Sequence, residues 1–264
     1  MSLKVKNLHI EASMRGNAKS TIVSNVSFEA EEGKRLALVG RSGCGKTMTA
    51  MAVLGLLPEN CTADGNIEWN GVELLSLSKK ERRALLGKEH VLIPQSGSDF
   101  LNPSLTVKRQ MSEALSRVEI PKREQQKYME RILERVGFDH IECVLNSYPF
   151  QLSGGMAQRI VMAMASTGKP RLVIADEPTR GIDRNNTEQF LSILNDLFSN
   201  SAVVLITHDM SIASKCDYIL VMNDGRVIEL GSSSEVLTNP KEAYTRQLIC
   251  DLPSSLSYAQ RGII

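Results

Sequence analysis

The sequence predicts an α/β fold in which a parallel sheet is joined to an antiparallel β layer and interrupted by an inserted helical segment. Three observations predict it. Residues 35–39 form an apolar run that breaks into a glycine-rich loop and then a helical pattern. Apolar runs return at 172–175 and 203–206 with a helical pattern between them, a rhythm typical of parallel strands. Residues 106–150, by contrast, are charged and helical in character.

Composition limits the class of protein. The chain has 264 residues, of which 42% are hydrophobic, which is enough for one large domain or two smaller lobes. The formal net charge is +1, so no excess of Lys and Arg is present to neutralise a nucleic-acid backbone, and we expect no nucleic-acid partner. The basic cluster at 79–83 is interrupted by Glu81 and is interpreted as a solvated helix face.

No apolar run approaches the roughly 20 residues needed to span a bilayer. Residues 1–6 also lack the apolar centre of a signal peptide. We therefore expect a cytoplasmic chain whose membrane role, if any, depends on partners.

The N-terminal part is predicted to be antiparallel β structure. Apolar and polar residues alternate loosely over 3–30. Asn70-Gly71 lies between two further short strands and is a strong hairpin signal. Ser78 and Glu81 have capping-box spacing and predict a short helix, which a buried strand at 91–93 follows.

The inserted segment is predicted to be helical at 107–118 and 122–136. Pro121 separates the two helices and Gly137 is expected to cap the second. After the run at 172–175, we expect a helix at 184–198.

The last part of the chain is expected to continue the sheet. A short helix near Met210 and a strand at 218–222 precede a turn at 223–225 and a final strand. The serine-rich residues 231–235 are interpreted as a helix N-cap.

The loop after residue 39 has the spacing G-x-x-x-x-G-K-[ST], which defines a phosphate-binding loop (P-loop). Its glycines let backbone amides converge on phosphate oxygens, Lys46 adds a positive charge, and the Thr47 hydroxyl can reach Mg²⁺. The helix that begins at Lys46 directs its positive end at the same phosphates. The expected nucleotide-binding residues are Gly40, Arg41, Ser42, Gly43, Cys44, Gly45, Lys46, Thr47 and Met48.

The five cysteines are scattered and form no C-x-x-C pair, which predicts free thiols and neither a disulfide framework nor a zinc site. Cys44 is the exception of interest, since it lies in the phosphate loop beside Lys46 near a helix N-terminus. We expect its pKa to be depressed and its thiol to react when the loop is empty.

Two acids follow the apolar run at 172–175. Asp176 and Glu177 would lie at the carboxyl end of a parallel strand, where ligands of α/β sheets bind. We expect Asp176 to hold Mg²⁺ through its hydration shell and Glu177 to polarise the water that attacks the γ-phosphate.

A glycine-rich stretch lies directly upstream of this strand. Leu152-Ser153-Gly154-Gly155-Met156 resembles the L-S-G-G-Q signature of ABC ATPases, with Met156 in place of the glutamine. Ser153 would cap a helix whose N-terminus, with Gly154 and Gly155, can bind an anion. The resemblance implies that this anion is the γ-phosphate held by the P-loop of a second ATPase subunit.

The other family elements can be located in order. Gln95 resembles the Q-loop glutamine that contacts Mg²⁺, and His208 resembles the switch histidine at the γ-phosphate. Residues 181–183 occupy the D-loop position, where Arg180-Gly181-Ile182 departs from the family pattern of small residue, Ala and Leu. This departure bears on whether both sites of a dimer are equally active.

The resemblance covers residues 3–253 and points to one subfamily within the ABC ATPases. Residues 95–107 are similar to the Q-loop region of the oligopeptide/nickel importer ATPases, and 147–151, 239–240 and 244–246 fit the same subfamily. Oligopeptide members usually carry clustered cysteines in a C-terminal extension, which this sequence lacks. That favours the nickel or metal–metallophore members over the oligopeptide ones.

The resemblance therefore implies the ATP-hydrolysing subunit of an ABC importer that uses ATP and Mg²⁺. The fold implied is a single ABC ATPase domain: a RecA-like P-loop NTPase core plus β subdomain at 1–99 and 167–264, and a helical subdomain at about 100–166. The implied partners are two membrane permease subunits at the cytoplasmic face of the membrane, an extracytoplasmic substrate-binding protein that acts indirectly, and a second ATPase subunit. For that subunit we expect a paralogous chain, with a second copy of this chain as the alternative.

Two other functions stay open. One is a soluble ABC ATPase outside transport; the other is a module that dimerises on nucleotide with little turnover. Many ABC ATPases carry an aromatic residue that stacks on adenine, where this sequence offers Ser20, Thr21 and Ile22. We therefore expect weaker recognition of the base.

Overall fold

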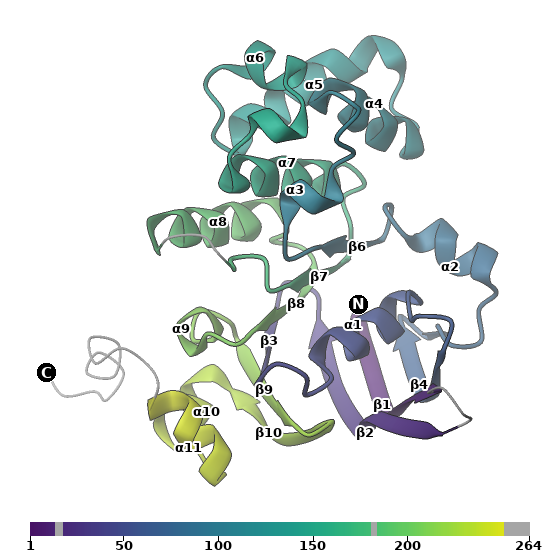
Figure 1. Ribbon diagram of the computed structural model, residues 1–264, viewed down its shortest axis with the longest axis vertical. Coiled ribbons are helices and arrows are strands. Elements are labelled where there is room, and N and C mark those ends of the chain that lie inside the picture. Colours follow the sequence, from purple (N-terminus) through teal and green to yellow (C-terminus); the bar gives the residue numbers. More distant parts are fainter. Residues whose placement is uncertain (14–17, 181–183, 251–264) are drawn as a thin grey trace, which may run out of the picture. The chain divides into compact units, whose positions relative to one another are not determined.

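The computed structural model describes residues 1–13, 18–180 and 184–250. The chain divides into two compact units, which are described one at a time. Unit 1 consists of Met1–Arg82 and Ala202–Ile264, and unit 2 of Arg83–Ser201. Figure 1 shows the elements of both units with their labels.

The first sheet of unit 1 is antiparallel, with strand order β2-β1-β4-β5. Its strands are β1 (Ser2–Ser13), β2 (Lys19–Glu31), β4 (Cys61–Trp69) and β5 (Val72–Glu73). The predicted hairpin is confirmed, since Trp69 pairs with Val72 and the two turn residues Asn70 and Gly71 have φ values of 50° and 85°. This sheet is the antiparallel layer that the sequence predicts.

The second sheet of unit 1 carries the phosphate loop, and its strands run in the order β10-β9-β3-β8. They are β3 (Arg35–Val39), β8 (Ala202–Thr207), β9 (Tyr218–Asn223) and β10 (Arg226–Ser232). The central strand β3 is parallel to both β8 and β9. Its apolar residues 36–39 are buried, as expected for a strand covered on both faces.

Unit 1 also contains short helices. They are α1 (Lys46–Leu54), α9 (Met210–Ala213), α10 (Ser233–Thr238) and α11 (Ala243–Cys250), while α2 (Lys79–Leu85) spans the boundary between the units. Both expected caps are confirmed. Ser78 Oγ accepts from Glu81 N at 3.3 Å, and Ser232 Oγ accepts from Glu235 N at 3.3 Å. Gly55 ends α1 in the left-handed conformation.

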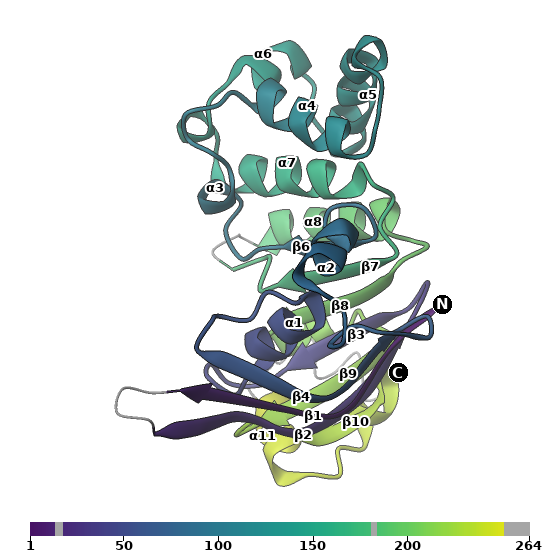
Figure 2. The ribbon, with the colours of Figure 1, turned by 90° about the vertical axis from the view of Figure 1, so that its right-hand side faces the viewer.

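Unit 2 combines two parallel strands with a group of helices (Figure 2). The strands are β6 (His90–Ile93) and β7 (Leu172–Asp176), and the helices are α3 (Gly97–Phe100), α4 (Val107–Arg117), α5 (Lys122–Arg135), α6 (Ile141–Asn146), the 3₁₀ turn η1 (Pro149–Gln151), α7 (Gly154–Ser166) and α8 (Arg184–Leu197). Helix α4 packs against α5, α6 and α7, and α7 also packs against β6 and α8. The predicted helical segment is therefore present, although α3, α6 and α11 were not anticipated.

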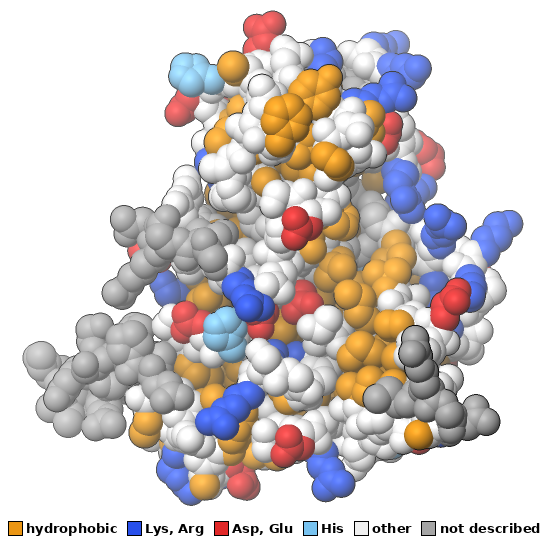
Figure 3. Space-filling view, viewed as in Figure 1, with side chains coloured by type: hydrophobic (Ala, Val, Ile, Leu, Met, Phe, Trp, Pro, Cys, Tyr) orange, Lys and Arg blue, Asp and Glu red, His pale blue; other side chains and the backbone are white. Residues whose placement is uncertain are grey.

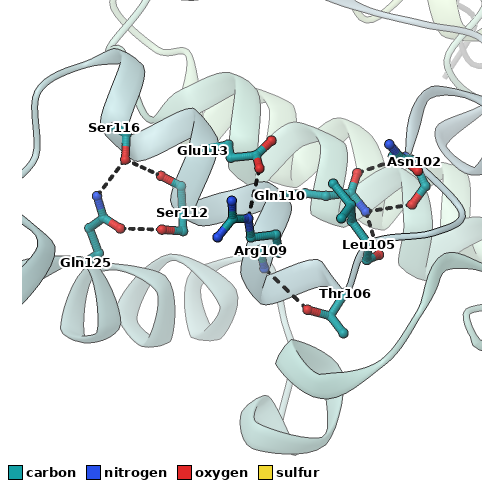
Figure 4. Close-up of polar contacts among 9 residues, drawn as sticks. All are labelled: Asn102, Leu105, Thr106, Arg109, Gln110, Ser112, Glu113, Ser116 and Gln125. Carbon is teal, nitrogen blue, oxygen red and sulfur yellow. Dashed lines mark hydrogen bonds and ion pairs between the residues drawn. The ribbon is translucent and has the colours of Figure 1, made fainter.

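Two buried glutamines connect α4 to its surroundings (Figure 4). Gln110 Oε1 accepts from Asn102 N at 2.9 Å, and its Nε2 donates to the carbonyls of Asn102 and Leu105 at 3.1 and 3.0 Å. On the next helix, Gln125 exchanges hydrogen bonds with Ser112 and Ser116. Gln110 thus satisfies the backbone of the turn at 102–105, which fixes the chain that enters α4.

The described elements confirm the predicted α/β class. None of the helices in the described part of the chain is both long and apolar enough to cross a membrane.

Candidate nucleotide site

The phosphate loop leaves β3 where the chain is tightly enclosed. A Cβ atom on Gly40 would lie 2.2 Å from the carbonyl oxygen of Met222, and one on Gly45 would lie 2.9 Å from Val23 Cγ2. Gly40 and Gly45 have φ values of 154° and 96°. A side chain at either position would collide with its neighbours in a backbone conformation that L-residues rarely adopt. These two glycines let the loop turn from β3 into α1 against β9 and β2.

Lys46 lies inside its own loop. Its side chain is 5% exposed, and Nζ donates to the carbonyl oxygens of Gly40 and Arg41 at 2.7 and 3.1 Å. Thr47, the next residue, is exposed. A buried ammonium and an exposed hydroxyl therefore sit at the first turn of α1, whose N-terminal amides favour an anion.

The pKa of Cys44 differs from the expected one. The residue is 5% exposed, and burial raises the pKa of its thiol, although the charge and amide of Lys46 act in the opposite direction. Desolvation of the thiolate outweighs the nearby charge, so the expected depression of this pKa is wrong. The thiol is a buried packing group in the loop.

His208 lies at the same edge of the sheet as the loop. Strands β3 and β8 are parallel, with Val39 paired to Thr207, so Gly40 and His208 leave neighbouring strands side by side. His208 is exposed, and the next residue, Asp209, caps α9 by accepting from Ser211 N at 2.7 Å. Unit 1 therefore brings His208 and the phosphate loop to one edge of the sheet.

Unit 2 repeats this arrangement with different residues. Strands β6 and β7 are parallel, with Ile93 paired to Ala175, so Gln95, which follows β6, and the acids Asp176 and Glu177, at the end of β7, lie at neighbouring strand ends. Glu177 has a φ of 43°, a left-handed conformation that costs energy for a residue with a side chain. Strain of this kind is often held at functional sites.

Arg180 connects two of these residues. Its Nη1 lies 3.6 Å from Glu177 Oε2. With the Gln95 amide oriented by its hydrogen bonds, the Gln95 oxygen accepts from Arg180 Nε and Nη1 at 3.3 and 2.9 Å. The only signal for this contact in the sequence is indirect: Glu177 and Arg180 are three positions apart.

The signature stretch forms the open N-terminus of α7. Ser153 is the N-cap, and its Oγ accepts from Met156 N at 3.3 Å, as predicted. A Cβ on Gly154 or Gly155 would meet nothing within 4 Å, so the first turn has free space beside it. The end of a 13-residue helix is thereby exposed to an incoming anion.

A pocket of about 320 Å³ lies beside this helix end, within unit 2. Its charged lining residues are Arg159 and Arg180, and no acid among the described residues lines it. The uncharged lining residues are Gln95, Ser96, Gly97, Ser98, Ser153, Gly154, Gly155, Met156, Gln158 and Asn186. Positive charge and a helix N-terminus together favour an anionic ligand.

The segment after Gln95 packs closely on α7. A Cβ on Gly97 would lie 2.6 Å from backbone atoms of Ala157 and Gln158. Gln158 Nε2 also donates to the Pro94 carbonyl at 2.9 Å. Helix α3 and the first turns of α7 therefore touch through their backbones.

The predicted site residues thus fall into two groups. Unit 1 holds the loop at 40–48 with His208, and unit 2 holds Gln95, the acids at 176–177 and the signature residues at 153–155. The D-loop position at 181–183 lies outside the described residues.

One contact of the loop was not predicted. Arg41 N donates to Tyr244 Oη at 3.1 Å, across 203 positions of sequence. No local sequence signal could indicate a contact over this separation.

Comparisons with known proteins agree with this arrangement. A family model described as ABC transporter matches residues 23–180. YejF of Agrobacterium fabrum, a peptidoglycan transport ATP-binding protein, is 38% identical over 257 residues that cover 95% of this chain and 47% of that protein. The chain thus spans about half the length of this relative.

Two other relatives are covered more fully. The dipeptide transport ATP-binding protein DppD of Bacillus subtilis is 37% identical over 95% of this chain and 76% of that protein. The metal-staphylopine import system ATP-binding protein CntD of Staphylococcus aureus is 35% identical over 86% of each chain.

Among solved structures, the dimeric post-hydrolysis state of an ATP-binding cassette with bound ADP and Pi has a TM-score of 0.76 at 24% identity, covering 88% of this chain and 98% of that one. This likeness supports the fold. With a family model that matches most of the chain and relatives above 30% identity over nearly its full length, the protein belongs to the ABC transporter family, as an ATPase of that family.

Proposed function

We propose that the protein is the ATP-hydrolysing subunit of an ABC importer that takes up a peptide or a metal–metallophore complex. The observation that carries the proposal is the presence in one chain of two separate anion-binding elements. One is the phosphate loop on β3, and the other is the open N-terminus of α7 beside Arg159 and Arg180. Two relatives are named as ATP-binding proteins, one of dipeptide transport and one of a metal-staphylopine import system.

The residues of unit 1 would bind the nucleotide. The amides of residues 43–48 would donate to phosphate oxygens, and Lys46 Nζ would exchange its loop carbonyls for the phosphates without leaving the loop. His208 would donate to the γ-phosphate from the neighbouring strand end. Ser20, Thr21 and Ile22 begin β2 without an aromatic ring, so we expect the base to contribute little affinity.

The available oxygen donors fit Mg²⁺, which prefers hard oxygen ligands. The Thr47 hydroxyl is exposed, and the Gln95 amide and Asp176 carboxylate follow adjacent strands. When bound, Mg²⁺ would neutralise charge on the β- and γ-phosphates. Thr47, Gln95 and Asp176 are therefore the residues that we propose hold it.

Glu177 would act on the attacking water. Its side chain is 12% exposed and is held by the strained turn after β7, so the carboxylate has a limited choice of positions. A carboxylate fixed in this way can orient a water molecule and accept its proton as the bond to phosphorus forms.

A second ATPase subunit would complete each site. Ser153, Gly154 and Gly155 offer an N-capped helix end, and no acid of the described residues lines the pocket beside it, which suits the γ-phosphate held by another subunit's loop. We expect this subunit to be a paralogous chain, with a second copy of the present chain as the alternative. Closure on ATP and opening after hydrolysis would then drive transport.

An exposed aromatic patch in unit 2 is the surface that we propose contacts a permease subunit. Phe100 is 55% exposed and Phe150 is 77% exposed, and Phe150 stacks on Tyr148 with ring centroids 5.7 Å apart. Figure 3 shows aromatic and other apolar side chains gathered on this face. Such exposed rings are typical of a contact surface. The protein would then be peripheral, at the cytoplasmic face of the membrane, with about residues 100–166 as the helical subdomain that meets two permeases.

The cargo is the finer part of the proposal. We favour nickel or a metal–metallophore complex as the cargo, with a peptide as the alternative. The similarity to CntD supports this choice, and the similarity to DppD supports the alternative. Substrate choice would belong to the permeases and to the extracytoplasmic binding protein.

Steady-state ATP hydrolysis by the chain and two variants tests the proposal. Glu177→Gln should keep ATP affinity and lower turnover at least about tenfold, the scale of lost general-base assistance. Lys46→Ala should weaken ATP binding itself. Unchanged turnover in the first variant would overturn the role of Glu177, and normal affinity in the second would overturn the phosphate-loop assignment.

Mass spectrometry of the complex after gentle membrane extraction tests the partners. Two permeases and a second ATPase subunit should accompany the chain. A chain recovered without permeases would instead favour a soluble ABC ATPase, and ATP-dependent dimers without turnover would favour a dimerisation module.

A further inference from the structure

The phosphate loop is held from outside by the C-terminal helix of unit 1. Arg41 is the second residue of the loop, and its backbone amide donates to Tyr244 Oη at 3.1 Å. Tyr244 is half-buried in the first turn of α11. This is a contact between a loop that we propose binds ATP and a helix that takes no part in the site described above.

Both backbone polar groups of Arg41, its amide and its carbonyl, have hydrogen-bond partners. Its carbonyl oxygen accepts from Lys46 Nζ at 3.1 Å and from Cys44 N at 3.3 Å, both within the loop. Its amide has its partner on α11. The loop therefore supplies the contacts of the carbonyl, whereas the direction of the amide depends on Tyr244.

Helix α11 is itself anchored by a buried carboxylate. Glu229 on β10 is 8% exposed, and it accepts from Lys241 N at 2.9 Å and from Glu242 N at 3.3 Å, just before the helix begins. Burial alone would raise the pKa of Glu229, but these amides and the Thr245 hydroxyl more than offset it, so the pKa is lowered. The carboxylate thus stays ionised at neutral pH and satisfies the free amides of the helix start.

Other contacts hold the same turn. Arg246 Nη1 donates to the carbonyls of Pro240 and Lys241 at 2.9 Å each, and Thr245, next to Tyr244, is fully buried. Strand β10 pairs with β9, which pairs with β3, the strand that enters the loop. One sheet therefore carries both the loop and the anchor of the helix that touches it.

We propose that Tyr244 is a positioning residue of the nucleotide site: its hydroxyl holds the Arg41 amide and pre-organises the phosphate loop, and Glu229 seats the helix that presents it. This inference rests on the proposed binding of ATP by residues 40–48. A loop fixed in advance loses less conformational freedom when phosphate binds. The contribution should appear in nucleotide affinity, since bound phosphates would hold the loop by themselves.

Tyr244→Phe tests the inference by removing one oxygen atom. A neutral hydrogen bond contributes about 1 kcal/mol, which corresponds to about fivefold in an equilibrium constant. In the full chain, we expect the dissociation constant and KM for ATP to rise about three- to tenfold, with kcat within about twofold. Tyr218→Phe is the matched control, since Tyr218 is a 41% exposed tyrosine of the same unit. It should leave ATP affinity unchanged.

Hydrogen exchange provides a readout besides activity. Amides of residues 40–48 should exchange faster in nucleotide-free Tyr244→Phe than in the wild type, and the difference should disappear at saturating ATP. Glu229→Gln should weaken ATP binding in the same direction while leaving the hydroxyl in place. If both residues act through one path, the double variant should lose little more than Tyr244→Phe alone.

The outcomes separate the inference from the proposed function. If Lys46→Ala abolishes ATP binding but Tyr244→Phe leaves both the affinity and the loop exchange unchanged, the positioning role is wrong and the proposed function stands. A fall in kcat with unchanged KM would also overturn the positioning role. Normal ATP binding by Lys46→Ala would instead overturn the proposed function, and the inference with it.

Discussion

His90 makes the stability of unit 2 depend on pH. The imidazole is 2% exposed at the start of β6, and burial lowers its pKa from 6.5 to about 4. Each unit of pKa difference corresponds to about 1.4 kcal/mol, so full protonation would cost about 3 kcal/mol. Below pH 6.5 the unfolded chain binds the proton and the folded chain does not. Stability therefore falls as the pH falls from 6.5 to about 4 and then levels off.

Between pH 7.5 and 5.0 the contribution of His90 should amount to about 2 kcal/mol in the free energy of unfolding. The perturbation is His90→Gln, which removes the titrating group. The assay is urea unfolding at both pH values, in which the wild type should lose about 2 kcal/mol more than the variant on acidification. A change in the free energy of unfolding that is the same at both pH values does not affect the test, because only the difference between the two pH values is compared.

His140→Gln is the matched control, since it removes an exposed histidine of the same unit. If wild type and His90→Gln lose the same stability between the two pH values, the imidazole is not buried in its neutral form. The placement of β6 beside β7, and with it that of Gln95, would then need revision.

Two further predictions concern the reactive groups of the two units. In the nucleotide-free chain, iodoacetamide should modify the exposed Cys143 and Cys250 at least about tenfold faster than the buried Cys44, as followed by peptide mass spectrometry; rapid labelling of Cys44 would contradict its burial and raised pKa. Arg180→Thr should raise basal ATP turnover by up to about fivefold. The substitution frees the Gln95 oxygen and the Glu177 carboxylate from an exposed guanidinium. An exposed ion pair of this kind contributes at most about 1 kcal/mol, which limits the effect. Arg123→Thr, which replaces an 85% exposed arginine of the same unit, is the control, and unchanged or lower turnover in Arg180→Thr alone would refute the reasoning.

Local signals predicted the elements that depend on local chemistry. The Asn70-Gly71 turn and the capping boxes at Ser78 and Ser232 are confirmed because the residues that form them lie within a few positions of each other. The strand at 35–39 was predicted without error, since an apolar run that ends in a glycine loop has two sharp boundaries. For the same reason the sequence placed Gln95, Asp176 and His208 at or just after strand ends, where the structure also has them.

Features that depend on tertiary packing could not be predicted from the sequence. The pKa of Cys44 was misjudged because proximity to Lys46 can be read from the chain, whereas the depth of burial cannot. Helix α11 was overlooked because its start is stabilised by Glu229, a side chain from another element. The contact of Tyr244 with Arg41 could not be foreseen, since nothing near either residue indicates the other.

Gly97 lets the segment after Gln95 pack closely on helix α7. With backbone atoms of α7 within 2.6 Å of where its Cβ would be, and Gln158 bonded to Pro94, the segment after Gln95 cannot slide over α7. Helix α3 and the first turns of α7 are therefore tightly packed, so a displacement of α3 would be passed on to the first turn of α7. A methyl group added at Gly97 would push α3 and α7 apart, so this glycine sets the distance between the two helices.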